Sequence, residues 1–186
     1  MISTNELRKG ISLEMDGTLY QVLEYHHIKT GRGSAQVRLR LRDVKGGHII
    51  EKTVQAGERF TRARMERRQV QYLYQDEDLY YFMDQSSYEQ TALDSVQLGD
   101  ALSYLKENLT LDLLIYNSEP IGVEMPLSVE LTITETGPSF KGDTAQGGTK
   151  AATLETGLLV QVPLFLNNGD VVKVDTRTGE YLERVS

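Results

Sequence analysis

Apolar and polar residues alternate with a period of two along most of this chain. Residues 37–42 read Val-Arg-Leu-Arg-Leu-Arg, which places three apolar side chains on one face of a strand and three arginines on the other. Further strand-like runs occupy residues 19–28, 72–74, 79–83, 128–133 and 171–174. The pattern predicts a chain built almost entirely from β-strands.

Turn signals recur between these runs about every 8–12 residues, a spacing typical of β-barrels and sandwiches. Asp16-Gly17 predicts a two-residue hairpin turn, because glycine accepts the positive φ that such turns need. Gly46-Gly47 and Asn168-Gly169 mark further turns. One segment departs from the pattern. Its apolar residues have helical spacing and predict a short amphipathic helix over 97–107; they are Leu98, Ala101, Leu102 and Leu105.

Two segments interrupt the strands and predict domain boundaries. The first is the polar stretch 62–68, and the second is Met125-Pro126-Leu127, where proline is typical of a strand end. We therefore expect three domains, at residues 1–64, 65–127 and 128–186. All-β domains of this size are usually SH3-like or OB-like barrels.

Composition narrows the function. The 186 residues include no cysteine, which excludes disulfides, cysteine-ligated metals and thiol catalysis. No apolar run approaches the roughly 20 residues of a membrane helix, and the first ten residues lack the apolar core of a secretory signal. We expect a cytoplasmic protein with no membrane partner.

The net charge of −7 is divided unevenly along the chain. Residues 1–68 hold 14 Lys and Arg against 8 Asp and Glu, a balance of +6, and residues 69–186 carry the balance of −13. An RNA surface would repel the acidic part of such a molecule and attract its basic part. The asymmetry therefore predicts that the basic part faces the RNA and that it sets the rate of association.

The segment 29–35, Lys-Thr-Gly-Arg-Gly-Ser-Ala, lies between two strand-like runs and is expected to be a hairpin tip. Glycines flank Arg32 on both sides and leave its planar guanidinium exposed, able to bind phosphate or to stack on a base. A solvated arginine at a plain hairpin tip is the alternative. Arg38, Arg40 and Arg42 form a stripe on one face of the strand that could neutralise RNA phosphates. A solvated face of the barrel is the alternative for this stripe.

Catalytic patterns are absent from the sequence. His26 and His27 are adjacent and point to opposite faces of a strand, and neither a H-E-x-x-H nor a G-x-S-x-G motif occurs. The Gly-rich segment 137–150 fails the Walker pattern, because Gly148 stands where lysine is needed. The acidic run 76–78 lacks the ligand spacing of a calcium loop. We expect no enzyme activity, no metal and no cofactor.

The C-terminal third carries a family resemblance. The spacing of Lys150, Gly157, Pro163 and Gly169, followed by the sequence Asp-Thr-Arg-Thr-Gly-Glu-Tyr at 175–181, resembles the signature stretch of bacterial translation elongation factor P. The resemblance extends over the whole chain, from its Leu-Arg-Lys-Gly start through the 29–35 tip and the Gly-Asp-Thr sequence at 142–144.

The resemblance implies one SH3-like (KOW-like) barrel followed by two OB-like barrels in an L-shaped outline similar to tRNA. It implies a monomeric, non-catalytic factor that binds both ribosomal subunits between the peptidyl-tRNA and exit sites. There it would stimulate peptide-bond formation and relieve stalling at consecutive prolines. A paralogue of this family and a general OB-fold RNA-binding protein remain the alternatives.

The resemblance also implies roles for particular residues. Arg32 would approach the CCA end of peptidyl-tRNA, supported by Lys29, Gly31 and Gly33. The sequence Gly142, Asp143 and Thr144 would lie near exit-site mRNA, and Tyr181 and Arg184 would contact the small subunit.

Arg32 is also the candidate modification site, at a position where the chain departs from many family members. Those members carry a lysine that is extended by β-lysylation, and arginine excludes that chemistry. Some arginine-tip members are rhamnosylated, but that branch does not usually place glycine after the arginine, as Gly33 does here. An unmodified arginine keeps its fork of donors.

Overall fold

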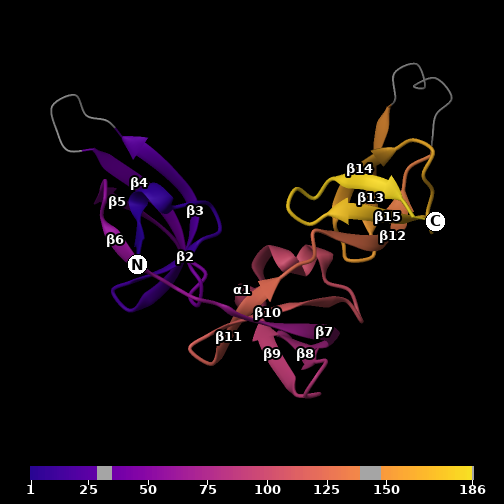
Figure 1. Ribbon diagram of the computed structural model, residues 1–186. Helices are drawn as coiled ribbons and strands as arrows, with labels where there is room; N and C mark the ends of the chain where they lie inside the picture. The colour runs from indigo at the N-terminus through magenta and orange to yellow at the C-terminus, as the bar shows by residue number, and fades with distance from the viewer. Residues whose placement is uncertain (29–34, 139–147, 186) are drawn as a thin grey trace. The chain divides into compact units, whose positions relative to one another are not determined.

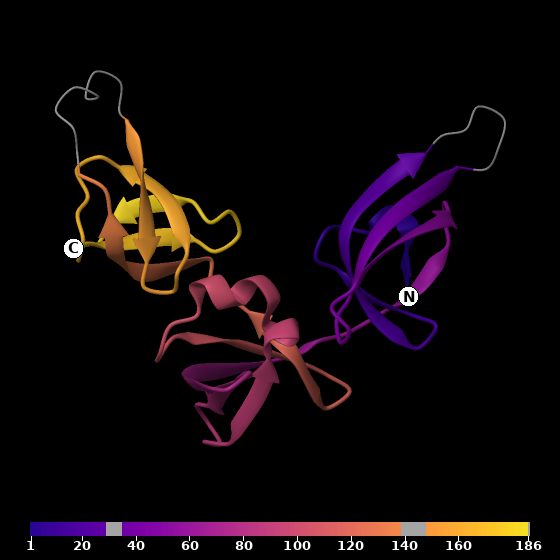
Figure 2. The same cartoon turned by 180° about the vertical axis from the view of Figure 1, so that it is seen from behind.

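The computed structural model describes residues 1–28, 35–138 and 148–185. These residues fold into three sheets with very little helix (Figures 1 and 2). Contacts divide it into two compact units. The first contains Met1–Arg67 and Leu114–Gly122, and the second contains Arg68–Leu113 and Val123–Ser186.

The first unit is built on a six-stranded sheet in the order β1-β6-β2-β3-β4-β5. Its elements are β1 (Ile2–Ser3), the 3-10 helix η1 (Thr4–Glu6), β2 (Ser12–Met15), β3 (Thr18–Ile28), β4 (Gln36–Asp43), β5 (Ile49–Gln55) and β6 (Arg59–Arg62). Asp16 and Gly17 connect β2 to β3 with φ of 52° and 77°, as the hairpin signal predicted. The Gly46-Gly47 signal likewise falls in the β4–β5 connection.

The alternation in β4 produces the core of this sheet. Val37, Leu39 and Leu41 are fully buried, while Arg38 and Arg40 are exposed on the other face. The apolar face packs with buried residues of β1, β2, β3, β5 and β6 in one cluster. Burial of each such side chain contributes about 1.5–3 kcal/mol to folding.

The second sheet has the order β11-β10-β7-β8-β9. Its elements are β7 (Glu66–Asp76), β8 (Leu79–Asp84), β9 (Gln90–Asp94), β10 (Thr110–Tyr116) and β11 (Glu119–Glu124), with the helical turns α1 (Ser95–Leu98) and η2 (Gly99–Tyr104) before β10. Phe82 and Leu93 are fully buried, and the rings of Phe82 and Tyr72 lie 5.4 Å apart between centroids.

The predicted helix over 97–107 is present in a shorter and displaced form. Only Ser95–Leu98 is α-helical, and Gly99–Tyr104 is a 3-10 helix. The start is set by a capping box, in which the Asp94 carboxylate accepts a hydrogen bond from Gln97 N at 2.8 Å. The α-helical turn stops because Gly99 has a φ of 52°. Leu98, Ala101 and Leu105 are buried, as their spacing predicted.

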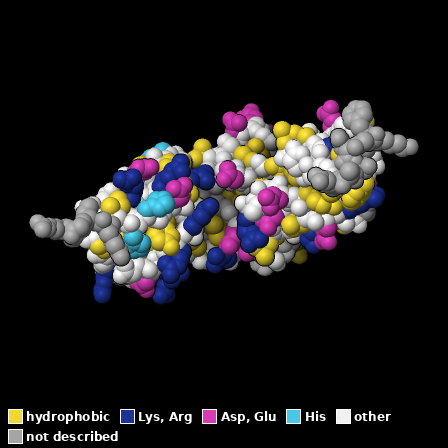
Figure 3. Space-filling view, turned by 90° about the horizontal axis from the view of Figure 1, so that it is seen from above, with side chains coloured by type: hydrophobic (Ala, Val, Ile, Leu, Met, Phe, Trp, Pro, Cys, Tyr) yellow, Lys and Arg dark blue, Asp and Glu magenta, His cyan; other side chains and the backbone are white. Residues whose placement is uncertain are grey.

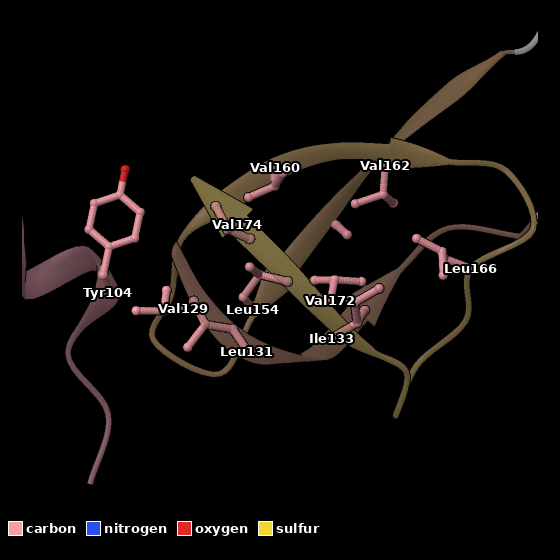
Figure 4. Packing of buried hydrophobic residues seen from close by; sticks show 11 residues of the cluster. Tyr104, Val129, Leu131, Ile133, Leu154, Val160, Val162, Leu166, Val172 and Val174 are labelled. Atoms are coloured by element: carbon pink, nitrogen blue, oxygen red, sulfur yellow. The ribbon is translucent and has the colours of Figure 1, made fainter. Parts of the chain in front are cut away.

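The third sheet has the order β14-β13-β12-β15-β16. Its strands are β12 (Ser128–Thr136), β13 (Thr149–Leu154), β14 (Leu159–Pro163), β15 (Val171–Asp175) and β16 (Tyr181–Arg184). Alternate residues of four of these strands point into a common aliphatic core, which Tyr104 of η2 also joins (Figure 4). Leu131, Val162 and Val172 are fully buried there.

The all-β class and the barrel-like sheets are therefore confirmed. The exact domain boundaries at 64 and 127 stay a prediction. No helix among the described residues is both long and apolar enough to cross a membrane.

Candidate RNA-contact sites

The β3–β4 hairpin carries the segment that holds Arg32. Lys29, Gly31, Arg32 and Gly33 lie outside the described residues. The structure describes the base of the hairpin, where β3 and β4 pair up to Ile28↔Gln36. Just beyond, Ala56 N donates a hydrogen bond of 2.8 Å to Ala35 O, so the chain following β5 also anchors this end of the hairpin.

The outer face of this hairpin is basic but partly neutralised. The predicted one-face arginine stripe is present, because Arg38 and Arg40 are exposed and Arg42 is half-buried on the same side of β4. Arg40 Nη1 donates to Glu24 Oε1 at 2.9 Å, and His26 Nε2 lies 3.7 Å from the same carboxylate. In Figure 3, Lys and Arg side chains gather over this part of the chain, where the histidine side chains also appear.

The adjacent histidines point to opposite faces of β3, as predicted. His26 faces Glu24 on the arginine side, whereas the His27 ring packs edge-on against Tyr25, with 6.1 Å between centroids. Across the parts of the chain that the structure describes, no group of three or more His, Asp or Glu side chains is arranged to hold a metal ion.

Gly142, Asp143 and Thr144 also fall outside the described residues. The two ends of their segment are held together within the third sheet. Lys150 Nζ donates to Gly137 O at 2.9 Å, and Thr136 Oγ1 donates to Ala151 O at 2.9 Å. These bonds fix where the segment leaves β12 and rejoins β13.

Tyr181 and Arg184 lie on β16 at the C-terminal edge of the third sheet. Tyr181 is half-buried and packs against the aliphatic core, so it supports the sheet. Arg184 Nη2 donates to Asp170 Oδ1 at 2.8 Å, and about half of its side chain (48 %) is exposed. Arg184 is thus an oriented cation on the surface.

A second oriented arginine follows β15. Asp175 accepts hydrogen bonds from Arg177 Nη2 and from Arg177 N, each at 2.7 Å, and a third from Nε at 3.2 Å. These bonds to the Arg177 side chain and backbone lower the pKa of Asp175 to about 2. The sequence identified Asp175 and Arg177 only as part of a signature, and not as a pair.

Sequence reasoning also assigned no binding role to residues 62–67, which it treated as a domain joint. In the structure, several of these residues line a hollow together with residues 9–12. The arginines clustered in residues 62–67 were the one sign of a binding site in the sequence. Residues 9–12, which lie about 50 residues earlier, could not be recognised as part of the same site from the local pattern.

Three family models match the chain in series. A model described as the elongation factor P KOW-like domain matches residues 3–60, the elongation factor P OB domain matches residues 65–123, and the elongation factor P C-terminal domain matches residues 129–184. A KOW-like domain followed by an OB domain agrees with the SH3-like and OB-like barrels predicted from the sequence.

Curated relatives match at full length. Elongation factor P of Moorella thermoacetica is 56 % identical over 99 % of this chain and 100 % of its own length. Elongation factor P of Pelotomaculum thermopropionicum is 53 % identical over the whole of both chains. Among solved structures, eukaryotic translation initiation factor 5A from Methanococcus jannaschii has a TM-score of 0.53 at 16 % identity, covering 67 % of this chain and 91 % of its own; it shows likeness of fold.

The fold and the matched domains define a translation factor assembled from small β-barrels. The chain belongs to the elongation factor P family. More than half of its residues are identical to those of each of the two bacterial relatives, over essentially its whole length.

Proposed function

We propose that this translation elongation factor binds the ribosome between the peptidyl-tRNA and exit sites and stimulates peptide-bond formation at consecutive prolines. Its partners would be both ribosomal subunits, peptidyl-tRNA and exit-site mRNA, and it would act as a cytoplasmic monomer. The observation that supports the proposal is the 56 % identity to an elongation factor P over 99 % of the chain, with matches to all three family domains.

Arg32 is the residue proposed to approach the CCA end of peptidyl-tRNA. It lies in the connection between β3, of 11 residues, and β4, of 8 residues. Eight residue pairs join these strands, and β4 pairs on its other side with β5. The paired strands therefore anchor the two points from which the segment with Arg32 extends.

The proposed mode of action is positioning and not catalysis by a side chain. Proline is a poor nucleophile, and a peptidyl-tRNA held in an unproductive geometry reacts slowly. Aligning reactants lowers the activation barrier without an acid, base or nucleophile from the factor. Arg32 would supply charge and planar donors to tRNA phosphates or bases.

Two further contacts are proposed for the C-terminal part of the chain. Gly142, Asp143 and Thr144 would face exit-site mRNA. Arg184, with Tyr181 packing beneath the same strand, would contact small-subunit RNA. Asp170 accepts a 2.8 Å hydrogen bond from Arg184, and a guanidinium has five N–H donors, so others are available for a phosphate.

The test is synthesis of a peptide with three consecutive prolines in a reconstituted translation system, with and without the factor. We expect the factor to accelerate this synthesis and to leave a matched proline-free peptide unchanged. Normal ribosome binding with no acceleration would remove the proline-stalling role and favour a paralogue of the family.

A further inference from the structure

A basic hollow opens in the first unit beside the end of β6. Its volume is about 750 Å³. Polar and charged side chains form part of its lining, and Gly10 lies among them. The side chains belong to Lys9, Ser12, Arg62, Arg64 and Arg67. The lining belongs to two segments that are about 50 residues apart in the sequence and lie together in the structure.

Backbone hydrogen bonds hold these two segments together. β6 pairs with β2 through Leu13↔Arg62, and Ala63 N then donates to Ser12 O at 3.1 Å. On the other side, Gly10 N donates to Val22 O at 2.8 Å. Ala63, which is only 8 % exposed, is one of the lining residues. Arg62 therefore extends from a paired strand, and Lys9 and Arg64 lie next to the hydrogen-bonded residues Gly10 and Ala63.

The wall of the hollow is open at Gly10. This residue has a φ of +88°, and a Cβ built on it would meet no atom within 4 Å. The positive φ favours glycine, and the absence of a side chain leaves the backbone accessible to a ligand at this point.

The charge of this lining is of one sign. Lys9, Arg62, Arg64 and Arg67 contribute four cations, and none of the lining residues is a carboxylate. Another hollow of the same unit differs, because it combines Glu14, Asp43 and Glu119 with a single lysine. An anionic ligand would be attracted to the first hollow and not to the second.

The lining also indicates which anion fits. It contains no aromatic side chain on which a base could stack, and its apolar members are Met1, Ile11, Ala63 and Met65. The volume far exceeds that of one phosphate ion. Several phosphates of a polynucleotide backbone, bound without reading the bases, match such a lining.

We propose that this hollow binds phosphate groups of an RNA backbone, with Lys9, Arg62 and Arg64 as the contacting cations. The inference rests on the proposed function, because it takes RNA of the ribosomal complex as the ligand. It adds a second RNA contact on the first unit, separate from the β3–β4 hairpin connection that carries Arg32.

The test compares two triple variants of the full chain. Lys9→Gln/Arg62→Gln/Arg64→Gln removes the proposed contacts. Lys45→Gln/Lys52→Gln/Lys173→Gln removes the same number of charges from exposed lysines that pair with Glu119, Asp16 and Glu183. Binding of each labelled protein to ribosomes carrying peptidyl-tRNA is measured across salt concentrations from about 50 to about 200 mM.

Loss of three phosphate contacts reduces the slope of log affinity against log salt concentration by about 2 to 3. We expect this reduction in the first variant and little change in the second, with unchanged thermal unfolding of both. Equal slopes for the two variants, with wild type binding well, would overturn the inference and leave the proposed function in place. Wild type that fails to bind ribosomes at any salt concentration would overturn both.

Discussion

Asp175 shows how a single carboxylate contributes to this fold. It ends β15, is mostly buried, and accepts three hydrogen bonds from Arg177. Those bonds lower its pKa from 3.8 to about 2. A group whose pKa is depressed by folding stabilises the protein above its unfolded pKa and loses that effect as the pH falls through the folded value.

We therefore expect Asp175→Asn to lower the midpoint of thermal unfolding at pH 7. The difference from wild type should shrink as the pH falls from about 4 to about 2, because wild-type Asp175 becomes protonated over that range. Glu183→Gln is the control, since Glu183 forms an exposed pair with Lys173 whose contribution is small. A difference that persists unchanged at pH 2 would contradict the argument.

Residue-scale features were predictable from sequence where the signal is local. Asp16-Gly17 specified its turn, and alternation in 37–42 specified which side chains of β4 are buried, because both depend on neighbouring residues. The Asp175–Arg177 pair was not predicted, since a two-residue spacing of opposite charges has many geometries. The proposed contacts of Arg32 stay predictions.

The elements of the chain are held by contacts between segments far apart in sequence. The turn between β10 and β11 belongs to residues 114–122, which contacts assign to the first unit. There, Tyr116 Oη donates a hydrogen bond of 2.7 Å to Glu14 Oε2 on β2. This bond raises the pKa of Tyr116, because the phenol donates to a carboxylate that its ionised form would repel.

Tyr116→Phe should lower the free energy of unfolding by about 0.5–1.5 kcal/mol, the usual loss for one partly exposed hydrogen bond. Urea unfolding measures the change. Tyr20→Phe provides the control, because Tyr20 is also half-buried in this unit but its hydroxyl has no hydrogen-bond partner among the described residues. Equal effects of the two substitutions would show that the Tyr116–Glu14 bond contributes nothing.

Sequence pattern located the strands better than the helix. Strand alternation is a strong signal over six or more residues, and β3, β4, β12 and β15 lie where it predicted. The α-helix lies before the predicted range 97–107, because the capping box at Asp94 sets its start and the positive φ of Gly99 sets its end. The spacing of the leucines gives no information on either end. The packing of residues 114–122 with residues 1–67 is a long-range contact, which a local sequence pattern cannot predict.

At the scale of the whole molecule, charge separates the basic first 68 residues, at +6, from the acidic remainder, at −13. A general single-stranded RNA-binding protein is expected to be basic along its groove, and most of this chain is acidic. The three domain models match in series, at residues 3–60, 65–123 and 129–184.

This charge distribution predicts weak binding to RNA outside the ribosome. We expect the protein to shift neither a single-stranded nor a duplex RNA at about 100 mM salt, while binding ribosomes that carry peptidyl-tRNA under the same conditions. A gel-shift titration beside ribosome pelleting measures both. Tight binding to naked RNA would favour the general RNA-binding alternative.

Arg32 is the residue proposed to accelerate proline–proline bond formation. The direct measurement is the single-turnover rate of that step with protein made without its native modifying enzymes, comparing wild type, Arg32→Ala and Lys52→Ala, which removes an exposed charge from β5 of the same sheet. We expect wild type and Lys52→Ala to accelerate the step and Arg32→Ala to bind ribosomes with little acceleration. Full acceleration by Arg32→Ala would contradict the claim. Acceleration only by wild type from its native source would show that Arg32 acts in a modified form.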